Sequence, residues 1–303
     1  MTQIPDPSSD DFVLFIGRVT DESFVEGLAE RSSLPVDMIR QRVLTAAGES
    51  AQTLRVLAGI DVAPGERILE VGAGLGLASS YLSSRGFDVT GLEPGGIGFE
   101  AYRTVSEHFA DLVGSQHAVL GITAEELSVE SHGRFALIFS NNVLEHVEDP
   151  GRALAALAGV TAPGGVMVHS CPNYSIPYEP HFGIPLIPMK PGWTARLLPS
   201  SIKDSSVWHS LNFIRARQVV STAATLRLDV HFRSGALAVS LRRFATDPEF
   251  RNRHRVLGVV SSVARMTGVL ALIDRLPATW STPMDFMLCS PSTDQDRVEA
   301  WMS

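Results

Sequence analysis

The stretch that most constrains the fold is "ILEVGAGLGLASSYLSSRGFDVTGLEPG", residues 68–95. A short apolar run leads into three closely spaced glycines, Gly72, Gly74 and Gly76, and a helical pattern follows at once. Glycine lets the backbone turn sharply and approach a ligand closely. The exposed N–H groups at a helix start also favour an anionic group. The stretch therefore predicts a strand, a ligand-binding glycine loop and a helix.

Two acidic residues accompany this loop. Glu93 lies 21 residues after Gly72, at the end of the second predicted strand, where an acid is placed to hold ribose hydroxyls. Glu70 puts a carboxylate at the lip of the loop, which suits a cationic amino group better than a pyrophosphate. Leu77 stands where the dinucleotide pattern GxGxxG requires glycine, and this disfavours a nicotinamide dehydrogenase. We therefore predict a different nucleoside-bearing cofactor.

The rest of the chain alternates between strand and helix patterns. "RILEV", "DVTGLE", "ALIFS" and "VMVHSC" are short apolar runs, and helical stretches separate them. Such alternation indicates a parallel sheet that is covered on both faces. Residues 22–60 have helical periodicity, residues 1–11 are expected to be disordered, and "MDFMLCS" near the end is a candidate last strand.

Residues 66–170 resemble the class I S-adenosylmethionine-dependent methyltransferases. "LEVGAGLG" resembles their first motif, "GLEPG" their ribose-binding acidic motif, and "FALIFSNNVLEHVEDPGRALAALAGVTAPGGVMVHS" their fourth-strand and fifth-strand region. The resemblance implies a doubly wound, Rossmann-like, mostly parallel seven-stranded sheet whose last strand is antiparallel. It predicts an N-terminal helical segment over residues 1–60, an S-adenosylmethionine-binding core over 61–170, a lid and acceptor-site segment over 171–215, and C-terminal strands with a helical cap over 216–303.

The resemblance also implies a cofactor site. The glycine loop and the end of the fourth strand would hold the methionine portion, Glu93 the ribose, and the "TAEEL" segment the adenine. Thr123 departs from the family pattern, which usually has aspartate at this position. The implied S-adenosylmethionine-binding residues are Glu70, Gly72, Ala73, Gly74, Gly76, Glu93, Thr123, Ala124 and Asn141.

"NNVLEHVEDP", residues 141–150, follows the fourth strand. In some relatives, the ubiquinone-pathway O-methyltransferases and small-RNA 2′-O-methyltransferases, this segment reads E-x-x-E-H and holds a divalent metal with a later histidine. Here Asn142 replaces the first glutamate, which removes a negative charge and weakens such a site. Glu145, His146 and the later His181 remain as ligands. The sequence thus allows a divalent metal without favouring one, and a packing role for "EHV" is the alternative.

"CPNYSIPYEPHFGIP", residues 171–185, follows the fifth strand directly. Its four prolines exclude a helix or a central strand. Long stiff loops at this edge of a sheet are usually lids or binding loops. We predict a lid in which Tyr174, Tyr178 and Phe182 wall an acceptor site and Glu179 and His181 are the polar groups. A crossover that only packs is the alternative.

Methyl transfer to oxygen requires a base, because a hydroxyl is a poor nucleophile until its proton is removed. His181 and His146 are the candidate bases, with Glu145 beside them. The sequence therefore predicts O-methylation of a small molecule, such as a sugar or secondary metabolite. An N- or C-methyltransferase and a non-catalytic S-adenosylmethionine-binding module are the alternatives. The pattern names neither the acceptor nor the oligomeric state.

Composition limits the partners and the compartment. The 303 residues carry a formal charge of −8, which argues against nucleic-acid binding. Two cysteines offer no disulfide framework, and the polar start of the chain has no apolar signal core, so a cytoplasmic location is expected. Residues 256–273 are apolar but interrupted by Arg265, so we expect a buried or surface-lying helix, not a membrane span. Residues 242–255 carry six basic side chains, which would suit an acceptor phosphate or a solvated face.

Overall fold

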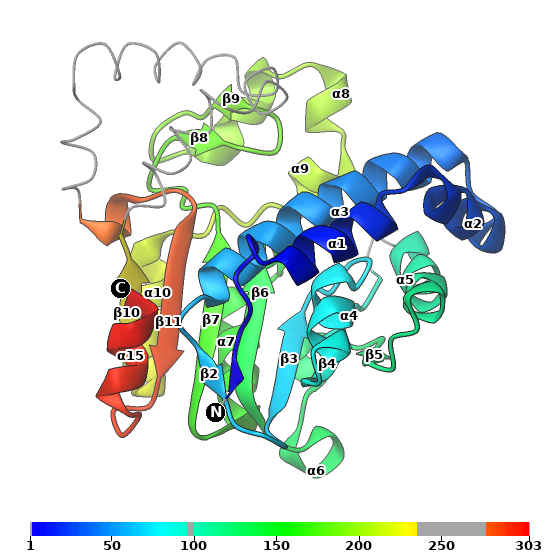
Figure 1. Cartoon of the computed structure of the whole chain (residues 1–303). Coiled ribbons are helices and arrows are strands. Elements are labelled where there is room, and N and C mark those ends of the chain that lie inside the picture. The colour runs from blue at the N-terminus through cyan, green and yellow to red at the C-terminus, as the bar shows by residue number, and fades with distance from the viewer. Residues whose placement is uncertain (1, 96–99, 235–276, 303) are drawn as a thin grey trace, which may run out of the picture.

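A seven-stranded sheet forms the centre of the computed structural model, which describes residues 2–95, 100–234 and 277–302. Its strand order is β10-β11-β7-β6-β3-β4-β5 (Figure 1). β11 pairs antiparallel with both of its neighbours, and the other pairings are parallel. The predicted mostly parallel sheet with an antiparallel last strand is thereby confirmed. The strands are β3 (Arg67–Val71), β4 (Asp88–Leu92), β5 (Ala118–Leu120), β6 (Phe135–Asn141), β7 (Thr161–Cys171), β10 (Asp229–Arg233) and β11 (Met284–Cys289).

Strand β3 lies between β4 and β6 and marks the point where the chain changes direction across the sheet. From β3 the chain continues to β4 and β5 on one side, and then returns to add β6 and β7 on the other. The loops that follow β3 and β6 therefore diverge at the carboxyl edge. Open α/β sheets bind their ligands in this crevice.

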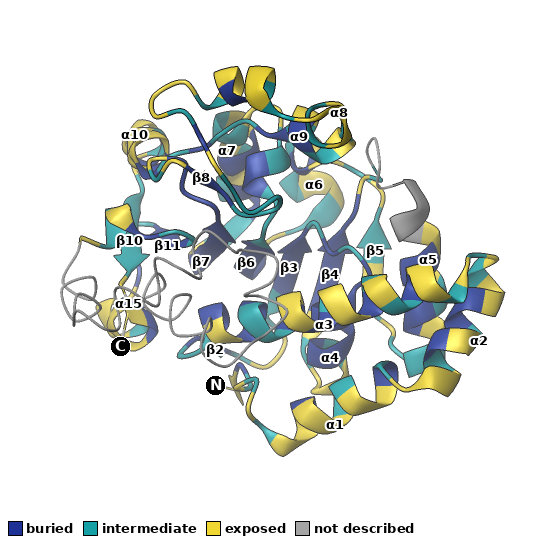
Figure 2. Ribbon diagram, turned by 90° about the horizontal axis from the view of Figure 1, so that it is seen from above, coloured by how far each residue is buried: buried dark blue, intermediate teal, exposed yellow. Residues whose placement is uncertain are grey.

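Helices cover both faces of the sheet (Figure 2). Leu69, Ile138 and Met167 pack on the face that carries α7 and α10, while their strand neighbours pack on the face that carries α1, α3, α4 and α15. Successive strand side chains point to opposite faces, so continuous apolar runs are what a doubly covered sheet requires. The helices are α1 (Asp10–Val19), α2 (Glu22–Ser32), α3 (Val36–Leu57), α4 (Leu77–Ser84), α5 (Glu100–Val113), α6 (Val129–His132), α7 (Pro150–Val160), α10 (Ala216–Leu226) and α15 (Gln295–Met302).

The N-terminal prediction was wrong in one respect. Residues 2–11 are ordered: β1 (Thr2–Gln3) pairs with β2 (Asp61–Val62), and the N–H of Ile4 donates to the carbonyl of Ile60. The physical reason is burial, because Ile4 and Phe12 are each only 3% exposed in the core beneath α3 and α4. Two apolar anchors thus hold a segment whose composition suggested disorder.

The segment of residues 171–215, the predicted lid, lies beyond the carboxyl edge of the sheet (Figure 1). It has its own apolar cluster around Tyr174, Leu186, Trp208 and Leu211. The side chains of Phe182 and Ile184 pack against that cluster. Because this segment buries apolar side chains among themselves, its shape is fixed locally. Its elements are β8 (Tyr178–Glu179), β9 (Ile184–Pro185), the 3-10 helix η3 (Pro191–Leu197), α8 (Ser200–Lys203) and α9 (Ser206–Ser210).

Two sequence predictions fall outside the described residues: the apolar helix over 256–273 and the basic run over 242–255. No helix among the described residues is both long enough and apolar enough to cross a membrane. Cys171 and Cys289 are buried free thiols on β7 and β11.

Candidate active site

The glycine loop between β3 and α4 has the backbone that only glycine adopts easily. Gly72 has φ +70°, and a Cβ at this position would overlap the side chain of Val143. Gly74 has φ +55°, and its N–H donates to Glu93 Oε2 at 2.8 Å. L-residues with a Cβ rarely occupy this left-handed region. The loop therefore packs against Val143 on one side, and a hydrogen bond to Glu93 holds it on the other.

Glu70 is a buried carboxylate beneath this loop, 8% exposed. Its Oε2 accepts hydrogen bonds from the N–H (3.0 Å) and the hydroxyl of Ser79. Burial raises the pKa of Glu70 to about 7, and the nearby charges of Glu93 and Glu49 act in the same direction. A cation bound beside this carboxylate would stabilise its ionised form.

A cleft of about 70 Å³ opens at the switch point between β3 and β6. Glu70, Gly72, Ala73, Gly74 and Asn141 line it from the sheet side. Asn141 donates from Nδ2 to the carbonyl of Glu49 at 3.2 Å, and its Oδ1 is buried without a hydrogen-bond partner in the part of the chain that the structure describes. This buried oxygen could accept a hydrogen bond from a ligand that carries an N–H or O–H group.

Helix α3 forms the other wall of this cleft, and the sequence reasoning missed it. Arg42, Thr45, Glu49 and Thr53 line the cleft together with Ala46 and Ser50. The signal was present, because these four polar residues repeat at helical spacing beside the apolar stripe that packs on the sheet. Pattern alone marks such a stripe as solvent-facing, and only the fold shows that it faces a cleft.

Four of the nine cofactor candidates are not in the lining of this cleft: Gly76, Glu93, Thr123 and Ala124. Gly76 is the N-cap of α4, with φ +73°. Thr123 caps the 3-10 helix η1 (Ala124–Glu126), and its hydroxyl and N–H both donate to Glu126. Ala124 is 7% exposed and packs in the core. The adenine assignment of Thr123 and Ala124 thus stays a prediction.

Glu145, His146 and His181 come together in one cluster. Glu145 and His146 belong to the 3-10 helix η2 (Leu144–His146) after β6, and His181 comes from the turn between β8 and β9. One ligand atom from each of the three lies within 4.8 Å of the others. The carboxylate of Glu145 is fully buried, and neither of its oxygens has a hydrogen-bond partner among the described residues. His181 Nε2 is 3.8 Å and His146 Nε2 is 4.0 Å from Glu145 Oε1.

Glu179 fixes His181 from the other side. Its Oε1 lies 2.6 Å from His181 Nδ1, its Oε2 accepts the N–H of Phe182 at 2.8 Å, and the hydroxyl of Tyr174 donates to Oε1 at 3.2 Å. Burial alone would lower the pKa of His181. The hydrogen bond to Glu179 and the charges of Glu179 and Glu145 outweigh it, so the pKa is raised. His181 is therefore the more basic histidine of the pair.

His146 has the opposite character. Its Nδ1 lies 2.7 Å from the hydroxyl of Ser210 on α9, so it links the segment after β6 to the predicted lid. Burial, with the charge of His181, lowers the pKa of His146 to about 4. Burial also raises the pKa of Glu145 to about 7. Neighbouring groups whose pKa values are pushed apart are typical of acid–base sites.

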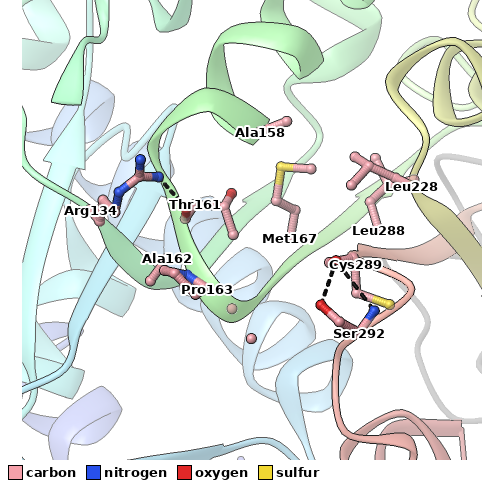
Figure 3. A pocket seen from close by; sticks show the side chains of 13 residues that line it. Arg134, Ala158, Thr161, Ala162, Pro163, Met167, Leu228, Leu288, Cys289 and Ser292 are labelled. Atoms are coloured by element: carbon pink, nitrogen blue, oxygen red, sulfur yellow. Dashed lines mark hydrogen bonds between the residues drawn. The ribbon is translucent and has the colours of Figure 1, made fainter.

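A cavity of about 360 Å³ lies at the opposite edge of the sheet (Figure 3). It is bounded by the start of β7 and the end of β11, and Arg134 is the one charged side chain in its lining of described residues. Arg134 donates to the carbonyls of Gly159 and Thr161 at 3.2 and 2.9 Å, as a structural clamp would. This cavity lacks the acid–base groups that the carboxyl edge gathers.

The strand–glycine loop–helix unit, the acid after the second core strand and the sheet with its antiparallel last strand define a class: the S-adenosylmethionine-dependent methyltransferases. The family model of the "Methyltransferase domain" matches residues 40–222, more than half of the chain. The protein belongs to this methyltransferase family.

The chain is also similar to individual known proteins. The chain is 34% identical over 234 residues to an uncharacterized protein of Mycobacterium tuberculosis, covering 74% of this chain and 78% of that one. It is also 34% identical over 112 residues to the ubiquinone biosynthesis O-methyltransferase of Caulobacter sp., covering 37% of this chain and 43% of that one. Among solved structures, the phosphoethanolamine N-methyltransferase 2 of Haemonchus contortus with S-adenosyl-L-methionine matches at a TM-score of 0.47 and 13% identity, covering 94% of this chain and 60% of that one.

Proposed function

We propose that this methyltransferase transfers a methyl group to a hydroxyl of a small molecule, with His181 as the general base. The observation that carries the proposal is the buried Glu179–His181–Glu145 cluster at the carboxyl edge. Transfer to nitrogen needs little help from a base, whereas transfer to a hydroxyl needs its proton removed. The partial similarity to an O-methyltransferase supports the same choice.

The cofactor assignments follow from the cleft. We assign Glu70 and Asn141 to the cationic methionine portion, because one is a buried acid and the other an unpartnered acceptor. The backbone of Gly72, Ala73 and Gly74 would lie along the same portion, and Glu93 would hold the ribose. Gly76, Thr123 and Ala124 keep the roles expected from the sequence.

The cleft and the histidine cluster are joined by short connections. Val143 fills the space beside Gly72, and Glu145 lies two residues later in the chain. Glu49 on α3 lies close enough to influence the pKa values of Glu70, Glu145 and His181. A methyl donor in the cleft and an acceptor under the lid would thus meet at this edge.

The residues around the acceptor then have separate roles in the methyl transfer. S-adenosylmethionine supplies the activated methyl group when it is bound. His181 Nδ1 donates to Glu179, which leaves Nε2 to take the hydroxyl proton as the new oxygen–carbon bond forms. Glu145, 3.8 Å from Nε2, stabilises the positive charge that His181 gains. His146 is held neutral by burial and orients the lid through Ser210.

A divalent cation at Glu145, His146 and His181 is a second candidate. The residues fit such an ion, because both oxygens of the buried Glu145 lack a hydrogen-bond partner among the described residues and the three ligand atoms lie within 4.8 Å of one another. Asn142, with φ +54°, follows β6 directly and offers an amide oxygen. The cation would supply Lewis-acid polarisation of the acceptor hydroxyl.

One experiment tests the proposal against three alternatives. S-adenosylhomocysteine formation is measured with panels of sugars, phenols and amines, with and without EDTA. We expect turnover with a hydroxyl acceptor that persists in EDTA. Turnover with amines alone would contradict O-methylation. Loss of hydroxyl methylation in EDTA that Mg²⁺ or Mn²⁺ restores would favour the metal site over His181 as a general base. Cofactor binding without turnover on any acceptor would favour a non-catalytic module.

The affinity for S-adenosylmethionine should rise with pH if Glu70 holds its cationic portion. The pKa of Glu70 is raised to about 7, so its ionised fraction grows from about one tenth at pH 6 to about nine tenths at pH 8. We expect a roughly ninefold gain in affinity over this range, because only the ionised form attracts the cation. Calorimetry at each pH measures it.

The matched variants are Glu70→Gln, which should show a flat profile, and Glu145→Gln, which should keep the rise. Glu145 also has a pKa raised to about 7, so this pair separates the two carboxyl groups. An equal rise in Glu70→Gln would remove Glu70 from the cofactor site.

A further inference from the structure

The outer surface of the lid carries an apolar tip. Met189 is 82%, Leu197 76% and Trp193 50% exposed, and the last two lie on η3. Lys190 Nζ sits 4.1 Å and Arg196 Cζ 4.9 Å from the centroid of the Trp193 ring. We call these five residues the η3 patch. Large apolar side chains gathered on a surface with cations mark an interaction site.

The η3 patch is rigidly mounted. The N–H of Ile187 donates to the hydroxyl of Thr194 at 2.9 Å, and Thr194 is 4% exposed. Ala195 and Leu198 pack inward against the cluster of Tyr174 and Trp208. The inner side of η3 therefore packs against the rest of the lid. The large side chains on its outer side stay exposed to solvent.

The charge around the η3 patch is opposite to that of the protein. The lid, residues 171–215, holds four basic residues and two acidic residues, Glu179 and Asp204, a net charge of +2, whereas the whole chain carries −8. Neither Lys190 nor Arg196 forms a salt bridge with a described residue. Both cations rest against the Trp193 ring and remain able to meet an anionic surface.

We propose that the η3 patch attaches this protein to the surface of an anionic lipid bilayer. Tryptophan prefers the boundary between acyl chains and headgroups, and Met189 and Leu197 would enter the acyl region beside it. Lys190 and Arg196 would meet the phosphates of anionic lipids. A stable protein interface needs about 20–30 residues on each side, far more than this tip offers.

The attachment has a consequence for access to the site. The lid lies at the carboxyl edge of the sheet (Figure 1), so an attached molecule turns that edge toward the bilayer. An amphiphilic acceptor in the membrane would then approach His181 from the side of the lid. The attachment itself does not depend on O-methylation.

Sedimentation with phosphatidylcholine vesicles, with and without phosphatidylserine, tests the proposal. We expect binding to the anionic vesicles that falls with added salt. Changing Met189, Trp193 and Leu197 together to Ser should lower the partition coefficient at least tenfold. Lys190→Gln and Arg196→Gln should each lower it about fivefold, the effect of one cation near such a surface. Melting temperatures of all variants show whether they fold.

Leu14→Ser is the matched control, because Leu14 on α1 is 71% exposed and lies outside the lid. It should bind vesicles as the unchanged protein does. Absence of binding to anionic vesicles overturns the proposal, and so does unchanged binding by the folded triple variant. An equal loss in Leu14→Ser would also overturn it, since any exposed apolar residue would then serve. Binding of equal strength to neutral vesicles would contradict the role of the cations.

Discussion

His181→Ala should lower kcat by about 10²–10⁴-fold, the typical effect of a positioned general base. The affinity for S-adenosylmethionine should stay nearly unchanged, because the cleft is lined by the glycine loop, Asn141 and α3. His181 is 25% exposed, and its side chain is held by Glu179. Its loss should therefore remove proton transfer without opening the core.

Turnover, cofactor affinity and melting temperature are measured on the same variants. Phe182→Ala is the neighbouring control: its ring packs beside Trp208, and we expect a change in acceptor KM with kcat largely kept. Glu179→Gln should keep the fold of the hairpin and shift the pH–rate profile to lower pH, because it removes the charge that raises the pKa of His181.

Other outcomes have definite meanings. A stable and fully active His181→Ala would show that His181 is not the base, and His146 would become the remaining candidate. If all three variants lose thermal stability and their activity follows the folded fraction, the segment is structural. Loss of activity in His181→Ala together with loss in EDTA would indicate the metal site.

The sheet was predictable because its information is local. A strand such as β3, buried on both faces, is mostly apolar, and the glycine loop after it favours a sharp turn between strand and helix. The position of β11 came from resemblance, not from periodicity. A mostly apolar run of six residues gives no sign of which neighbours it pairs with or in which direction.

The N-terminus shows where local reading fails. Ile4 is an isolated apolar residue in an acidic, proline-containing stretch whose composition favours disorder, and Phe12 begins the apolar run that follows. Their burial depends on a gap beneath α3 and α4 that exists only after the sheet has formed. Tertiary packing of two side chains decided the outcome there.

The residues of the candidate site were predictable from the sequence, but the hydrogen bonds between them were not. Glu145, His146 and His181 were named from the sequence, but the bond from His181 to Glu179 depends on the β8–β9 hairpin. The link from His146 to Ser210 spans 64 residues and requires the lid to fold over η2. Contacts between distant segments leave no periodic signal along the chain.

Glu93→Ala should weaken S-adenosylmethionine binding by about 1.5–3 kcal/mol, the usual loss for hydrogen bonds to a charged group. This corresponds to a roughly 10- to 150-fold higher Kd. Glu93 is 7% exposed, and it accepts the N–H groups of Gly74 at 2.8 Å and Gly95 at 3.3 Å. The carboxylate thus ties the glycine loop to the end of β4.

Calorimetry with S-adenosylmethionine and with S-adenosylhomocysteine measures the effect of Glu93. Glu93→Gln keeps one acceptor oxygen and should lose less affinity than Glu93→Ala. Glu130→Ala, which removes an exposed acid on α6 at the other end of the molecule, controls for the change in net charge (Figure 1). Because both cofactors share the ribose, both should weaken equally in Glu93→Ala. Unchanged affinities would show that Glu93 does not hold the ribose, and a loss confined to S-adenosylmethionine would place Glu93 at the sulfonium instead.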